Sequence, residues 1–196
     1  MRITRAVIVA LVLLGSGISG ASEQGDKPGV SAEKTFVLDW LSQPAVVEEF
    51  GQISEKIWRF AELGLQEFQS SALLIETLEK EGFHVDKGLA GMPTCFVASY
   101  GTGKPVIGIL AEFDALPMLS QKGGVPQKEP LVEGAPGHGC GHNLMGSAAT
   151  AAAIAVKHCM EKYNLHGTIK LFGSPAEETL ISRFFLGKRK GRSHSP

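Results

Sequence analysis

The sequence lacks the long hydrophobic runs and paired cysteines of a membrane-spanning or disulfide-stapled protein. Its longest apolar run covers only residues 6–14, far short of the ~20 residues that a transmembrane helix needs. Three cysteines, Cys95, Cys140 and Cys159, cannot all pair within one chain, so at least one is expected to be free or metal-bound. With 43% hydrophobic and 20% charged residues and no internal repeat, the composition excludes collagen-like, coiled-coil and wholly disordered chains.

Basic side chains are scarce in the body of the chain. Residues 22–182 hold 12 basic and 20 acidic residues, a net charge of −8. A nucleic-acid-binding surface needs clustered lysine and arginine, so we expect no nucleic-acid partner. Residues 181–196 carry five basic residues and no acid, which predicts a basic, disordered or frameshifted tail.

The N-terminal residues have the pattern of an export signal. Arg2 and Arg5 precede the apolar run, and a small-residue stretch containing Ser19 and Ala21 suits a signal peptidase. We therefore predict a signal peptide over residues 1–21, with an uncleaved anchor as the alternative, and a flexible leader over residues 22–35. The protein is expected to be periplasmic or secreted, with no stable membrane span after cleavage.

Hydrophobic spacing predicts strands alternating with helices, which is typical of an α/β fold around a central sheet. One predicted helix has Ser70 or Ser71 as its N-cap and ends before Gly82. Strand 106–111 is apolar on both faces, which predicts a place in the middle of the sheet. The remaining expected elements are helices over 44–60 and 145–162 and strands over 94–100 and 168–172.

Three polar segments follow predicted strands or precede a helix, namely residues 111–117, 137–143 and 173–178. Loops at the carboxyl ends of strands are where α/β proteins place their sites. Cysteine, histidine and glutamate are common zinc ligands, and the glycines around Cys140 and His142 let the backbone aim both side chains at one point. Adjacent acids after Pro175 can divide their roles, one binding a metal and the other transferring protons.

These motifs resemble the aminoacylase and carboxypeptidase G family of dinuclear metallohydrolases, peptidase family M20. The likeness is greatest to its aminobenzoyl-glutamate utilisation protein B-type amidohydrolases, and it rests on residues 58–64, 113–117, 137–143 and 175–178. The resemblance implies a three-layer zinc-peptidase-like sandwich with a central mixed sheet. It also implies metal ligation by Cys140, His142 and Glu178, general-base catalysis by Glu177 and an orienting role for Asp114.

The same resemblance implies zinc or manganese as cofactor, two ions per full-length site, and hydrolysis of an N-acyl amino acid, aminobenzoyl-glutamate or a dipeptide. Full-length relatives are expected to form homo- or hetero-oligomers. Their greater length includes a lid and dimerisation domain and two further ligand histidines. We therefore expect residues 36–180 to be the N-terminal part of a truncated catalytic domain, binding at most one metal ion and inactive or nearly so.

Several alternatives accompany this interpretation. A structural zinc site normally has a second Cys/His pair, which the sequence lacks, and a Cys140 nucleophile would normally take its histidine from elsewhere in the chain. His138 is an open candidate for supporting the ligands, whereas Glu62 is expected to be a structural or capping carboxylate. A further alternative is a non-catalytic metal-binding or interaction module that needs a partner chain to complete its sheet.

Overall fold

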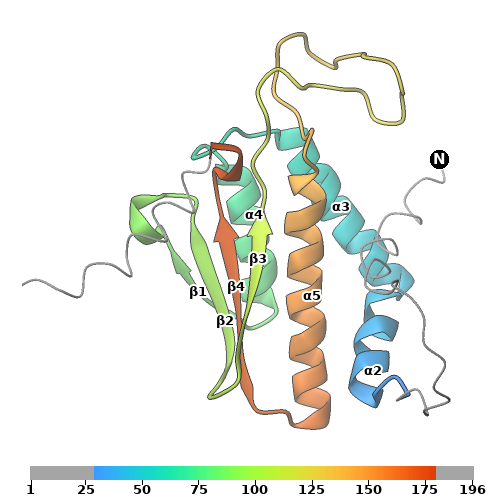
Figure 1. The fold of residues 1–196 in the computed structure, drawn as a ribbon, viewed down its shortest axis with the longest axis vertical. Helices are drawn as coiled ribbons and strands as arrows, with labels where there is room; N and C mark the ends of the chain where they lie inside the picture. The colour runs from blue at the N-terminus through green and yellow to red at the C-terminus, as the bar shows by residue number, and fades with distance from the viewer. Residues whose placement is uncertain (1–28, 180–196) are drawn as a thin grey trace, which may run out of the picture.

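The computed structural model describes residues 29–179 (Figure 1). The predicted signal peptide over 1–21 and the tail over 181–196 lie outside this range, as does the first half of the leader, residues 22–28. The helices are α2 (Ala32–Leu41), α3 (Pro44–Phe60), α4 (Phe68–Lys80) and α5 (His142–Tyr163), with short 3-10 turns η1 (Leu89–Gly91) and η2 (Glu177–Thr179). The strands are β1 (His84–Lys87), β2 (Phe96–Thr102), β3 (Val106–Glu112) and β4 (Gly167–Ser174).

The four strands form one mixed sheet in the order β1-β2-β4-β3. Strands β1 and β2 pair antiparallel, as do β2 and β4, whereas β3 pairs with β4 in parallel. The expectation that residues 106–111 lie in the middle of the sheet is wrong. Because β4 enters between β2 and β3, β3 lies at the edge of the sheet that residues 29–179 form, and Val106 and Ile107 are 56% and 54% exposed.

Helices α4 and α5 cover one face of the sheet, with α4 against β1 and β2 and α5 against β3 and β4. Helices α2 and α3 pack on α5 from outside (Figure 1). The α/β class and the mixed sheet are confirmed. Within residues 29–179, however, no helix packs on the opposite face, so the expected third layer is not found in this part of the chain. None of the described helices is long and apolar enough to cross a membrane.

Local capping decides where the first helices begin. Helix α2 begins at Ala32, inside the predicted leader, because Ser31 accepts the backbone N–H of Lys34 at 3.2 Å as an N-cap. Helix α4 begins at Phe68, so Ser70 and Ser71 are not its N-cap. The Glu62 carboxylate instead accepts the backbone N–H groups of Gln69 and Ser70 at 2.9 and 2.8 Å, as expected of a capping residue.

The core lies between the sheet and the helices that cover it. Ile57, Leu74, Ile154 and Leu171 come from three helices and a strand and are at most 1% exposed. Cys95 and Cys159 are buried and free, whereas Cys140 is free and exposed. Through this core, α5 packs against β3 and β4.

Candidate metal centre

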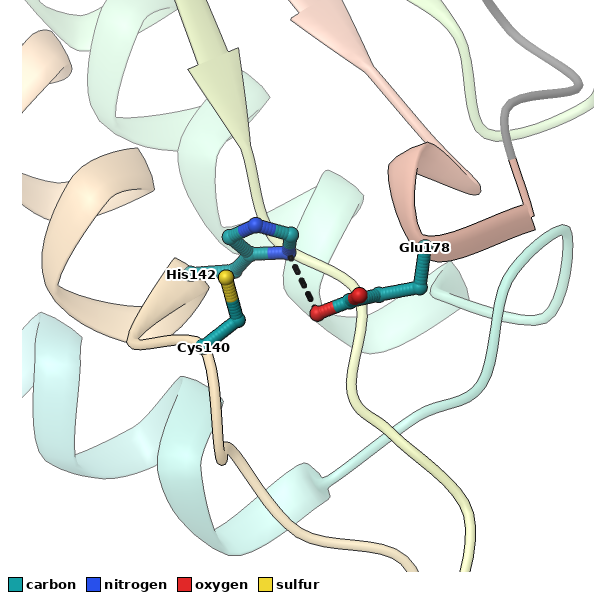
Figure 2. A group of neighbouring side chains, drawn as sticks. All are labelled: Cys140, His142 and Glu178. Carbon is teal, nitrogen blue, oxygen red and sulfur yellow. Dashed lines mark ion pairs between the residues drawn. The ribbon is translucent and has the colours of Figure 1, made fainter.

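The three polar segments meet beyond the carboxyl ends of β3 and β4. Because β3 and β4 are parallel neighbours, Asp114 after β3 lies close to the η2 turn after β4, which carries Glu177 and Glu178. His142 begins α5, and the preceding Gly141 has a φ of +81°, a backbone conformation that suits glycine. Figure 2 shows Cys140 on the loop that enters α5 and His142 at the start of that helix, with the Glu178 carboxylate reaching the imidazole from η2.

Asp114 holds the buried His142 ring in place. Nδ1 of His142 lies 3.0 Å from the Asp114 carboxylate and 3.1 Å from its backbone carbonyl, and both residues are 1% exposed. Burial opposes charge on both groups, yet the hydrogen bond between them lowers the pKa of Asp114 and raises that of His142. Glu178 joins this arrangement by donating its backbone N–H to Asp114 at 3.0 Å.

Two groups of potential ligands share His142. In the first, ligand atoms of Cys140, His142 and Glu178 all lie within 4.8 Å of one another, and in the second Glu112, His142 and Glu177 do so. Nε2 of His142 lies 3.4 Å from Glu112 and 3.8 Å from Glu177, whereas Nδ1 lies 3.7 Å from Glu178. The structure thus brings together all five residues that the sequence singled out.

Glu112 is the member of this cluster that sequence reasoning missed. It ends β3 and is only 4% exposed. Its position at the end of an apolar strand and two residues before Asp114 is the signal that could have identified it, because α/β proteins place their sites where strands end.

The donor set fits a divalent metal ion. A thiol, an imidazole and carboxylates are the ligands that zinc prefers. Oε1 of Glu178 is buried and has no hydrogen-bond partner among the described residues, and coordination to a metal ion would satisfy this oxygen. Desolvation and the charges of Glu178 and Glu177 raise the pKa of the Cys140 thiol, so a bound cation would be needed to hold it as a thiolate near neutral pH.

Another buried carboxylate, that of Glu67, supports the loop that carries Glu177 and Glu178. Glu67 is fully buried and accepts the backbone N–H of Ala176 at 2.7 Å and the hydroxyl of Thr94 at 2.9 Å. Desolvation raises the pKa of Glu67. The sequence drew no attention to this residue, which lies far from the loop along the chain.

The histidines outside the cluster make other contacts. Nε2 of His138 lies 3.0 Å from the Ile57 carbonyl, so this ring is tied to the end of α3. His158 pairs with Glu81 and Glu161 and packs against Trp40. These contacts agree with structural roles.

Comparison with known proteins identifies the family. Residues 108–192 match the peptidase family M20/M25/M40. A p-aminobenzoyl-glutamate hydrolase subunit of Escherichia coli (strain K12) is 46% identical over 139 residues, which is 71% of this chain and 29% of that protein. The chain belongs to the peptidase M20 family. Thermostable carboxypeptidase 1 of Saccharolobus solfataricus is 34% identical over 130 residues, 65% of this M20 chain and 31% of the relative.

The fold agrees with this assignment. A Bacillus subtilis protein described as a dinuclear metal-binding peptidase of the M20 family superposes with a TM-score of 0.61 at 22% identity. The alignment covers 74% of this M20 chain and 40% of that structure. The chain spans about three-tenths of the length of the two relatives compared by sequence, 29% of the hydrolase subunit and 31% of the carboxypeptidase.

Proposed function

We propose that this M20 chain contributes metal-binding residues to the active site of a metal-dependent amidohydrolase. The observation that carries the proposal is the convergence of a thiol, an imidazole and a carboxylate whose ligand atoms lie within 4.8 Å of one another. Cys140, His142 and Glu178 would hold the ion, which when bound supplies Lewis-acid activation of water and of the amide carbonyl. We propose zinc or manganese as that ion.

The chain's own residues have complementary tasks in this scheme. Asp114 fixes the His142 ring, so that Nδ1 carries the proton and Nε2 is available as a ligand. The Glu177 carboxylate lies 3.8 Å from Nε2 on the partly exposed η2 turn, a position from which it would take a proton from water and return it to the leaving amine. An amide bond would thereby yield an amine and a carboxylic acid.

The proposed substrate is an N-acyl amino acid, aminobenzoyl-glutamate or a dipeptide. The names of the relatives, a p-aminobenzoyl-glutamate hydrolase subunit and a carboxypeptidase, support an amide attached to an amino acid. Because the described residues place one thiol and one buried imidazole at the cluster, we propose at most one bound metal ion per chain and little or no turnover by this chain alone.

An assay on the purified 196-residue chain tests these claims. The chain is incubated with Zn²⁺ or Mn²⁺, and release of the amine from aminobenzoyl-glutamate and a dipeptide panel is followed, with metal content measured in parallel. We expect one bound ion and negligible turnover. Robust turnover would contradict the proposed inactivity, and absence of metal binding would contradict the proposed function.

A second candidate function is an interaction module that needs a partner chain. The edge strand β3 favours it, because Val106, Ile107 and Leu110 are 47–56% exposed and no strand among residues 29–179 pairs with its outer side. Light scattering of the purified chain distinguishes a monomer from a dimer. A concentration-dependent dimer that is lost in Ile107→Lys would support this candidate, whereas a monomer at all concentrations would contradict self-pairing through β3.

We also propose export, on the pattern of residues 1–21. Mass spectrometry of the protein expressed in a bacterial host is expected to find a periplasmic form beginning at Ser22. A form that keeps Met1 in the cytoplasm would contradict export.

A further inference from the structure

The second ligand group gives Glu112 a specific task. We propose that Glu112 is a direct ligand of the metal ion bound through Nε2 of His142, a role that rests on the metal binding proposed above.

The position of the ring proton follows from the partners of Nδ1. The Asp114 carboxylate at 3.0 Å and the Asp114 carbonyl at 3.1 Å are both hydrogen-bond acceptors, so Nδ1 carries a proton. In the neutral ring, Nε2 then presents a lone pair. This is the tautomer in which a carboxylate orients a histidine for metal binding through its other nitrogen.

The atoms that face Nε2 are carboxylate oxygens. Oε2 of Glu112 lies at 3.4 Å and Oε2 of Glu177 at 3.8 Å. A lone pair facing two anions in a site where His142 is 1% exposed is repulsive unless a cation lies between them. That cation is either a proton on the ring or a metal ion that accepts electrons from the nitrogen and from at least one of the two carboxylates.

The spacing suits a metal ion. Bonds of about 2.0–2.1 Å at tetrahedral angles place neighbouring nitrogen and oxygen ligands ~3.3–3.4 Å apart. The Glu112–Nε2 distance of 3.4 Å meets that spacing, and the Glu177–Nε2 distance of 3.8 Å exceeds it. Glu112 is also the more firmly held of the two, since it is 4% exposed and paired within the sheet opposite Ser174.

Metal titration of the 196-residue chain tests the proposal, with Co²⁺ as a probe whose visible absorption reports on its ligands. Glu112→Gln keeps the size of the side chain and removes its charge. Glu112→Asp keeps the charge and shortens the reach by one methylene. We expect both variants to bind Co²⁺ at least about tenfold more weakly than the unaltered chain and to change the visible d–d bands.

Glu177→Gln is the matched control, because it removes an equal charge facing the same nitrogen. Its Co²⁺ affinity is expected to stay within about threefold of the unaltered chain. Thermal unfolding without metal checks that each variant is folded, and an unfolded Glu112→Gln leaves Glu112→Asp as the test. Unaltered affinity and spectrum in Glu112→Asp would overturn the proposal alone, whereas no Co²⁺ binding by the unaltered chain would overturn it together with the proposed function.

Discussion

The Glu67 carboxylate accepts a 2.7 Å hydrogen bond from the backbone N–H of Ala176, 109 residues away along the chain and next to Glu177. Ala176 has a φ of +55°, a left-handed conformation that is unfavourable for alanine. Gly64 lies directly against it, so close that a Cβ at position 64 would come within 2.9 Å of Ala176. These contacts hold the strained residue from which η2 projects its two carboxylates.

Replacing Glu67 is therefore expected to loosen this loop. Glu67→Ala leaves the buried N–H of Ala176 and the Thr94 hydroxyl without their acceptor, which should lower the free energy of unfolding by about 2–4 kcal/mol. Glu67→Gln keeps one acceptor oxygen and should cost clearly less. Chemical denaturation measures both values. Equal effects of the two substitutions would contradict this prediction, because Glu67→Gln keeps the volume of the side chain and one of its two acceptor oxygens.

Titration of His142 is expected to depend on Asp114. In the metal-free chain, the hydrogen bond and charge of Asp114 raise the pKa of His142 above its usual value of about 6.5. This raised pKa contributes stability that is fully present below the unfolded pKa of histidine and is lost as the pH rises through the folded pKa. Asp114→Asn should lower the His142 pKa in an NMR titration of the ring. An unchanged pKa would contradict the coupling of these two residues.

The contribution of Asp114 to the stability of the folded chain is lost at low pH. The pKa of Asp114 is lowered in the folded chain, so its contribution is present above the unfolded pKa and is lost as the pH falls through the folded one. Asp114→Asn should therefore flatten the acid side of the curve of unfolding free energy against pH. A curve with the same acid slope in both chains would contradict this.

Metal affinity should separate Cys140 from Glu177. Cys140→Ser removes the softest donor of the cluster and is expected to abolish tight Zn²⁺ binding, because a thiolate is a strong zinc ligand. Glu177→Gln should leave Zn²⁺ binding intact, because that carboxylate is assigned to proton transfer. Competition with a chromophoric chelator measures both affinities. Two zinc ions per chain, or unaltered affinity in Cys140→Ser, would show that the ligand assignment is wrong.

Burial of Cys95 predicts a loss of stability in alkali. Desolvation raises the pKa of its thiol to about 11, above the ordinary value of 9.0. Its contribution is fully present below the unfolded pKa and is lost as the pH rises towards the folded one. The free energy of unfolding should fall by up to about 2–3 kcal/mol more in the unaltered chain than in Cys95→Ala across this range. Parallel declines in the two chains would contradict the assignment.

Local patterns in the sequence were sufficient to predict several parts of this protein. The apolar spacing of residues 44–60 predicted α3 because a helix places every third and fourth side chain on one face, and that periodicity needs no knowledge of the neighbours. Gly82 predicted the end of α4 for a similarly local reason, a φ of +82° after the last turn. The glycines around Cys140 and His142 likewise indicated a tight loop that aims both donors together.

Contacts between distant segments were decided only by the tertiary structure. The apolar residues 106–111 suggested a central strand, but the entry of β4 between β2 and β3 left them at the edge, and strand order is not encoded in the strand's own composition. The capping of α4 by Glu62 rather than by a serine within the helix depends on how the preceding loop folds back. Glu112 and Glu67 gained their importance in the same way, because ionic and hydrogen-bonding partners such as His142 and Ala176 reach them only after the sheet and α5 have packed.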